Sequence, residues 1–347
     1  MPWSSEPARR AYYPPNSYLV VPDRCWEFPE LDQLASYLAD PQVAVPAKVE
    51  GALSLMAWAR WSAERAVLVG CAAADTFAST HDAALGELTA RAHAGEPEDA
   101  ADALGLAAQM LVVSAWRVRT GARADDVPKA VWPHFHRLLE GADELGRQAL
   151  LLRPGDPLAA VARLTSGRGL GLPPDEWWPR FEVARKAEPT LFPGHAQMLQ
   201  ALCLKWYGSH DTLLDFARTT AEQAPAGEPV TAMLPLAHLE LWLAADTVDV
   251  SWRREQVRRD LPLIDHCSRA FLTADAQSLA EGSRRRHPRT PEAHQLFGWM
   301  LWRENHPAAA THLARARGRR SELPWDYYPD AEATFRRALA ETGVPPA

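Results

Sequence analysis

Cysteine is scarce in this 347-residue sequence, and its spacing fits no metal motif. The four cysteines, Cys25, Cys71, Cys203 and Cys267, form no C-x-x-C pair, and all but Cys25 lie in apolar segments with helical periodicity. Zinc ribbons and dithiol redox sites need such close pairs. We therefore predict reduced core thiols in a cytoplasmic protein, with no disulfide, no metal and no cofactor.

Long apolar runs are also missing. The residues after Met1 contain no apolar core of the kind that a signal peptide needs. The most apolar stretch, residues 104–118, is interrupted by Gln109 and Arg117 and is shorter than a bilayer requires. We expect neither secretion nor a membrane span.

Lysine is rare, with four lysines against 33 arginines, a ratio typical of GC-rich bacterial genomes. The formal charge of −7 argues against general nucleic-acid binding. Residues 251–347 hold 16 Lys and Arg against 12 Asp and Glu, whereas the first 250 residues hold 21 against 32. The basic C-terminal third could attract an acidic partner, although a solvated helix face is the simpler interpretation.

Strand signals are nearly absent, and the best candidate, Tyr18–Val21, is only four residues long. It lies in residues 1–28, whose prolines and aromatic residues predict an extended N-terminal arm. From Pro29 onward, apolar residues recur every three or four positions, which predicts successive helices. The longest early patterns predict one helix over Val45–Val69 and a central packing helix over Glu96–Thr120, whose first turn is acidic.

The same periodicity predicts further helices at His134–Leu152, Pro157–Leu164, Asp175–Ala187, Gly194–Trp206, Asp211–Ala224, Val230–Ala244, Trp252–Glu281, Pro291–Asn305, Pro307–Arg317 and Trp325–Thr342. Pro262 predicts a kink, or two helices, within one of these spans. The glycine- and proline-rich segment Thr165–Pro174 predicts a linker. It would divide a helical bundle at residues 29–164 from a helical array at residues 175–347.

Two segments, Gly194–Ala224 and Thr290–Arg317, each combine an apolar-periodic helix, a short polar break and a second, alanine-rich helix. In the second segment Thr290 is the expected cap and Pro291 the first helical residue. The apolar positions there alternate small and large residues: Leu296, Phe297, Met300, Ala309, Leu313 and Ala316. This unit resembles a tetratricopeptide-repeat hairpin, although Gly298 stands one place late, and the first segment resembles it more loosely.

The overall layout is similar to uncharacterised tetratricopeptide-like proteins of high-GC bacteria. The resemblance implies an all-α protein, with a right-handed helical-repeat α-solenoid after the N-terminal helical bundle. Such repeats bury their apolar faces by stacking and leave a long surface for other proteins. The resemblance implies protein or peptide binding only, because no activity accompanies the repeat.

Two motifs contain residue types that are common in active sites. Ser209-His210-Asp211 brings together a hydroxyl, an imidazole and a carboxylate, but a catalytic triad needs these groups to converge from separate elements. We interpret the motif as a helix cap. Ser166–Gly171 resembles a phosphate-binding loop only in its glycine count, because it follows a predicted helix instead of a strand.

A third cluster has metal-like composition. His134 and His136 are followed by Glu140, Asp143 and Glu144, and three of these five residues lie one helical turn apart. A carboxylate-bridged metal site would need matching ligands from other helices. An exposed polar face is the simpler interpretation.

Aromatic and arginine side chains offer the best candidates for binding, because tryptophan and arginine dominate interaction hot spots. Most of the 14 tryptophans should pack in the core. The densest basic run, Arg284–Arg289, could be a solvated loop between helices. If that run binds a ligand, paired guanidinium groups would recognise carboxylates or phosphates. The predicted binding residues are Trp177, Trp178, Trp206, Tyr207, Arg284, Arg285, Arg286 and Arg289.

These observations favour a non-catalytic scaffold that binds a protein or peptide on the concave face of a helical array. Two alternatives stay open. One is an all-helical enzyme of specialised metabolism, with a tryptophan-lined pocket and the His134, His136 and Glu140 face. The other is a regulator that senses a short peptide. The sequence specifies neither the ligand nor the oligomeric state.

Overall fold

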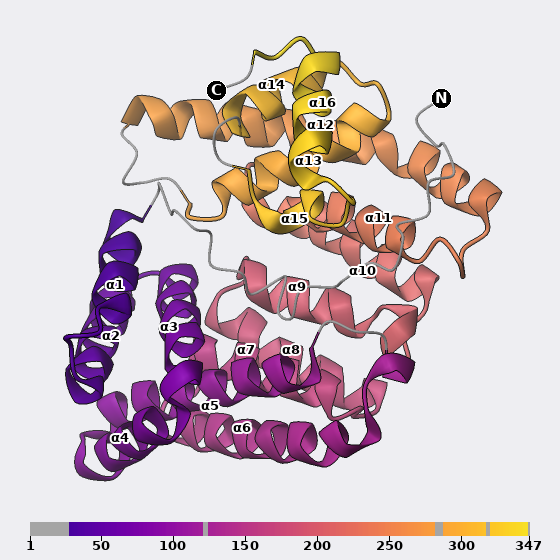
Figure 1. Ribbon diagram of the computed structural model, residues 1–347. Coiled ribbons are helices and arrows are strands. Elements are labelled where there is room, and N and C mark those ends of the chain that lie inside the picture. Colours follow the sequence, from indigo (N-terminus) through magenta and orange to yellow (C-terminus); the bar gives the residue numbers. More distant parts are fainter. Residues whose placement is uncertain (1–27, 121–123, 282–286, 317–319, 346–347) are drawn as a thin grey trace. The chain divides into compact units, whose positions relative to one another are not determined.

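The computed structural model describes residues 28–120, 124–281, 287–316 and 320–345, and every regular element within them is a helix (Figure 1). The predicted all-α class is therefore confirmed. The predicted arm and the strand candidate Tyr18–Val21 lie outside the described residues, apart from Phe28. None of the described helices is long and apolar enough to cross a membrane.

The chain divides into two compact units between Ala201 and Leu202. We call residues 28–201 the N-terminal unit and residues 202–345 the C-terminal unit, and each is described separately. The helices of the N-terminal unit are α1 (Pro29–Ala39), α2 (Val45–Ala59), α3 (Ala63–Phe77), η1 (Ala78–Thr80), α4 (His81–Ala94), α5 (Pro97–Arg119), η2 (Ala124–Asp126), η3 (Lys129–Val131), α6 (Trp132–Leu152), α7 (Pro157–Gly169), α8 (Pro174–Ala187) and α9 (Phe192–Ala201).

Helix α5 is the centre of the N-terminal unit. It packs against α3, α4, α6 and α7, and every residue from Ala100 to Trp116 is buried. Pro97 begins the helix, Glu98 and Asp99 occupy its first turn, and its last turn is basic, which agrees with the helix dipole. The predicted central packing helix is confirmed.

The predicted helix over Val45–Val69 is two helices, so this prediction is wrong. Helix α2 ends at Ala59, and Ser62 begins α3 by accepting a hydrogen bond from the backbone N–H of Arg65 at 3.4 Å. A serine hydroxyl at this position satisfies an N–H group that a helix start leaves unpaired. Residues 60–62 therefore form the corner between α2 and α3.

The predicted linker at Thr165–Pro174 is also wrong over its first half. Helix α7 continues to Gly169, and residues 164–169 are all buried. The two glycines at 167 and 169 are covered by neighbouring side chains, among them Arg180 and Leu139. The small residues therefore serve close helix packing, where the sequence pattern suggested flexibility.

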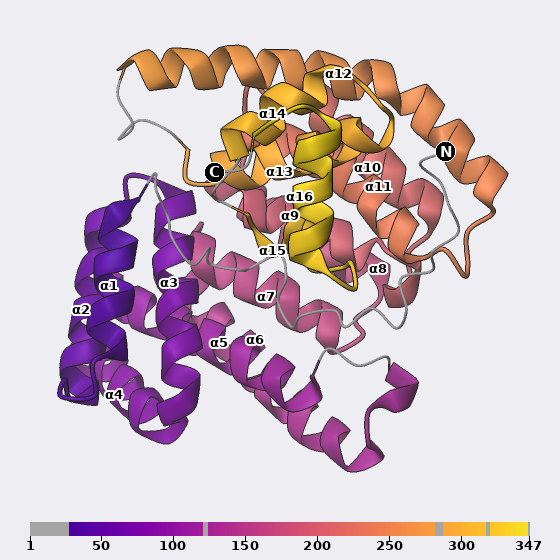
Figure 2. The ribbon, with the colours of Figure 1, turned by 45° about the horizontal axis from the view of Figure 1, so that its top comes forward.

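The C-terminal unit is a second all-helical body. Its helices are η4 (Leu204–Trp206), α10 (His210–Gln223), η5 (Pro229–Ala232), α11 (Met233–Leu243), α12 (Val250–Glu281), α13 (Thr290–Arg303), α14 (Ala308–Ala316), α15 (Glu322–Trp325) and α16 (Ala331–Glu341). Helix α12 is one element of 32 residues that continues through Pro262, so the alternative of two helices is wrong (Figure 2).

The predicted α13–α14 hairpin is present. Helix α13 begins at Thr290 with Pro291 in its first turn, and the cap is Arg289, not Thr290 as expected. Helices α13 and α14 pack directly on each other. At Gly298 a Cβ atom would lie 2.9 Å from Leu313, so glycine allows the close approach of the two helices.

Candidate interaction surfaces

The two predicted binding tryptophans on α8 have opposite environments. Trp177 is 1% exposed, whereas Trp178 is exposed and makes an edge contact with Phe181 at 6.3 Å between ring centroids. Adjacent residues on a helix point about 100° apart, so only one of them can face the core. A side chain as deeply buried as Trp177 serves packing, and we no longer place it in a binding surface.

Trp206 and Tyr207 belong to the C-terminal unit and lie in a tight turn. The backbone N–H of Trp206 donates to the carbonyl of Cys203 at 2.8 Å, and Tyr207 has a left-handed backbone with φ +72°. Lys205 fixes the turn by donating to Glu240 at 2.8 Å. Burial raises the pKa of Glu240 to about 8. Trp206 is half-buried and Tyr207 is exposed, so the turn presents the tyrosine to solvent.

The predicted arginine run gives a mixed result. Arg284, Arg285 and Arg286 lie outside the described residues. Arg289 is 1% exposed and donates to the carboxylate of Glu292 at 2.6 Å. A buried guanidinium bonded in this way holds the start of α13, so we remove Arg289 from the binding surface.

The other polar motifs serve local structure. The Ser209 hydroxyl caps α10 by accepting from the N–H of Thr212 at 3.1 Å, and Thr212 accepts in return from the N–H of Ser209 at 3.0 Å. This reciprocal cap confirms the interpretation of Ser209-His210-Asp211 as a helix start.

The metal-like cluster on α6 is divided among separate contacts. Asp143 accepts from Arg163 at 3.2 Å and also from Arg180. Hydrogen bonds from Arg147 lower the pKa of Glu144 to about 2. His136 packs against aromatic rings. Within the described parts of the chain, no group of His, Cys, Asp and Glu side chains could hold a metal ion.

Sequence reasoning missed the buried polar face of α12. Asp260 accepts from Arg218 at 2.7 Å and from His238 at 3.0 Å, and both partners are on other helices. Burial acts to raise the pKa of Asp260, but the hydrogen bonds from His238 and Arg218 outweigh it and lower the pKa. The network joins α10, α11 and α12.

A second buried network lies further along α12. The Ser268 hydroxyl is 2.7 Å from Nε2 of His312, whose Nδ1 is 2.9 Å from Nδ1 of His294; Nε2 of His294 is 3.2 Å from Asp275. Burial, and then His294, lower the pKa of His312 well below 6.5. These are the residue types of a hydrolase triad, but Ser268 is fully buried. The network joins α12, α13 and α14.

Among the tryptophans that the structure describes, the most exposed are Trp58 and Trp61, at the corner between α2 and α3. Trp58 is 51% exposed and Trp61 is 63% exposed, and their rings meet edge to face at 6.3 Å. Phe28, which is buried, stacks on Trp58 with 6.3 Å between the ring centroids. The guanidinium of Arg65 lies 4.7 Å from the ring of Trp61. These contacts hold both rings in place on the surface.

Carboxylates surround the same corner. Arg60, between the two tryptophans in sequence, bonds Glu98 at 3.0 Å and Asp102 at 3.2 Å and lies 3.5 Å from Asp99. Glu98 and Asp99 are exposed at the start of α5. One arginine therefore faces three carboxylates, so the corner combines exposed aromatic rings with an acidic border. We call Trp58, Trp61, Glu98 and Asp99 the tryptophan corner.

Comparison with known proteins adds no assignment: no protein-family model, no curated protein and no solved structure matches this chain. The tetratricopeptide resemblance therefore stays an interpretation of the hairpin pattern. The all-α class is shown by the helices themselves.

Proposed function

We propose that this protein is a non-catalytic scaffold that binds another protein or a peptide, and that the tryptophan corner is a contact surface. The observation that carries the proposal is the pair of exposed indole rings, in edge-to-face contact, at the break between α2 and α3. Tryptophan is the residue type most enriched among interaction hot spots, and a ring fixed by its neighbours loses little entropy on binding.

The size of the surface sets what the corner can contribute. Covering both half-exposed indoles would remove roughly 200–250 Å² of apolar surface from water, which corresponds to about 5–6 kcal/mol. A micromolar complex needs about 8 kcal/mol of net binding free energy. Association also costs translational, rotational and side-chain entropy, so the corner alone does not supply a micromolar affinity. It can anchor a partner only together with further contacts, among them polar contacts from Glu98 and Asp99.

The helical-repeat interpretation is part of the same proposal. We place α13 and α14 in a right-handed array of tetratricopeptide-like hairpins, whose concave face offers a second surface for a partner. The direct packing of these two helices through Gly298 supports this interpretation. The solvent-exposed Tyr207 marks a candidate contact in the C-terminal unit.

Selection from a random peptide library tests the proposal and requires no identified partner. Peptides displayed on phage are selected on the wild-type protein and then tested on the double variant Trp58→Ser/Trp61→Ser. Leu151→Ser is the matched control, because Leu151 is also exposed in the same unit and lies on α6. The proposal expects peptides that bind the wild type and the control but not the double variant. Selected peptides that bind all three proteins equally would contradict it.

A further inference from the structure

A small cavity opens in the C-terminal unit where the turn after α10 passes over α12. Its volume is about 280 Å³, and it lies between the end of α10, η5 and the middle of α12. Gly227 closes one side with φ +90°, and a Cβ atom at this position would lie 2.4 Å from Ala274. Glycine therefore lets the turn contact α12 closely and forms the cavity wall.

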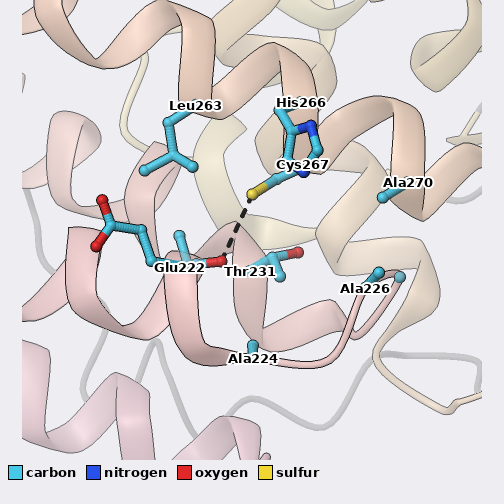
Figure 3. Close-up of a pocket in the computed structure, with 10 residues that line it drawn as sticks. Glu222, Ala224, Ala226, Thr231, Leu263, His266, Cys267 and Ala270 are labelled. Carbon is cyan, nitrogen blue, oxygen red and sulfur yellow. Dashed lines mark hydrogen bonds between the residues drawn. The ribbon is translucent and has the colours of Figure 1, made fainter.

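Apart from Glu222 and His266, the residues that line the cavity have no ionised side chain and are mostly small and apolar. Small residues, Ala221, Ala224 and Ala270, leave the space open. The thiol of Cys267 points from α12 toward α10 and lies 3.7 Å from the carbonyl oxygen of Ala221 (Figure 3). Burial, and then the Glu222 carboxylate, raise the pKa of Cys267 to about 11, so the thiol is neutral at physiological pH. The Thr231 hydroxyl donates a hydrogen bond to the backbone carbonyl of Glu228 at 2.6 Å.

The mouth of the cavity is polar. Glu222 on α10 and His266 on α12 both line it, and both are exposed. In Figure 3 the Glu222 carboxylate points away from Cys267 and Thr231. The site therefore joins an apolar interior to a carboxylate and an imidazole at the entrance.

We propose that this cavity binds a small organic amine, with an apolar ring system inside and the ammonium group at Glu222. An apolar cavity of about 150 Å³ accommodates benzene, so 280 Å³ provides room for one or two fused rings. The carboxylate at the mouth favours a cation over an anion. The interior has no ionised group to pair with a charge, so burying a charged group there would be unfavourable. The proposal concerns the C-terminal unit alone and does not depend on the tryptophan corner.

Indole, tryptamine and indole-3-acetate test the proposal as probes of the same ring with no charge, a positive charge and a negative charge. Ligand-observed saturation-transfer NMR on the full chain measures their dissociation constants. Fragments of this size bind with dissociation constants on the order of millimolar. Tryptamine should bind about tenfold more tightly than indole-3-acetate, because Glu222 attracts one and repels the other. Equal binding of the two charged probes would overturn the assignment of the ammonium site.

Two variants locate the binding. Ala270→Leu fills the cavity and should weaken indole and tryptamine binding at least tenfold, whereas Ala276→Leu, at an exposed position on the same helix, should not. Glu222→Gln should remove the preference for tryptamine and leave indole binding unchanged, with the exposed Glu255→Gln as its control. Indole binding that survives Ala270→Leu would overturn the proposal.

A readout on the wild-type chain removes any dependence on how the variants fold. Tryptamine in the cavity should slow alkylation of Cys267 by N-ethylmaleimide, while the buried Cys71 of the N-terminal unit should react at an unchanged rate. Mass spectrometry after protease digestion separates the two thiols. If saturating tryptamine leaves the rate at Cys267 unchanged, the cavity is not the binding site.

Discussion

Asp260 is the residue whose substitution tests most clearly whether buried polar groups hold α12 in place. Arg218 contacts two carboxylates that differ in burial. Asp260 lies 2.7 Å away and its side chain is 3% exposed, whereas Asp215 lies 3.2 Å away and its side chain is 73% exposed. Asp260→Asn removes the buried charge and keeps the shape. It leaves the Arg218 guanidinium in the interior with Gln256 and the exposed carboxylate as its remaining partners. Removing one member of a buried pair costs about 3–5 kcal/mol, whereas exposed pairs contribute about 0–1 kcal/mol.

Asp215→Asn is therefore a matched control on the same arginine. Urea unfolding followed by circular dichroism gives the free energy of unfolding of each variant. We expect a loss of about 3 kcal/mol for Asp260→Asn and less than about 1 kcal/mol for Asp215→Asn. Hydrogen exchange should locate the loss to α10, α11 and α12. Equal effects of the two substitutions would refute the role given to the buried network.

Three further predictions concern single residues. Burial lowers the pKa of His195 to about 4, whereas the pKa in the unfolded state is about 6.5. The N-terminal unit should therefore keep its full stability above pH 6.5 and lose roughly 3 kcal/mol of unfolding free energy as pH falls from 6.5 to 4. Urea unfolding at several pH values should show this dependence in the wild type and not in His195→Gln. Gly298→Val should lower the free energy of unfolding by about 1–3 kcal/mol, because the valine would overpack against Leu313. Adding Leu313→Ala should recover part of that loss in a double-mutant cycle. Simple additivity of the two substitutions would contradict this prediction. Cys267 should react with iodoacetamide about 100-fold more slowly at pH 8 than a thiol of pKa 9, as measured by mass spectrometry, and a reaction at the ordinary rate would show that the thiol is not buried.

Local sequence signals predicted the elements that local physics controls. The acidic start of α5, together with its apolar periodicity, located the central helix of the N-terminal unit. The cap at Ser209 and the α13–α14 hairpin followed from short motifs. The corner between α2 and α3 was missed because the apolar periodicity of Val45–Val69 continues across it. The serine at 62 followed by Ala63-Glu64 was the available signal, since serine is a preferred N-cap residue.

Tertiary contacts decided the features that the sequence pattern could not. Trp177 and Trp178 have the same residue type, and only the packing of α8 shows which one is buried. The partners of Asp260 on α10 and α11 are 42 and 22 residues away in the chain, so no local pattern connects them. One sequence signal was nevertheless present in α12, where Asp260, Ser268 and Asp275 recur on the apolar face.

The binding constant of a selected peptide measures the role of the tryptophan corner most directly. Fluorescence anisotropy with a labelled peptide from the library would compare the wild type, Trp58→Ser/Trp61→Ser and Leu151→Ser. Two hot-spot tryptophans of about 2 kcal/mol each predict a loss of roughly 1,000-fold for the double variant and less than about twofold for the control. A double variant that binds the peptide as tightly as the wild type, with its circular dichroism spectrum unchanged, would contradict the proposal that this corner is where the protein meets its partner.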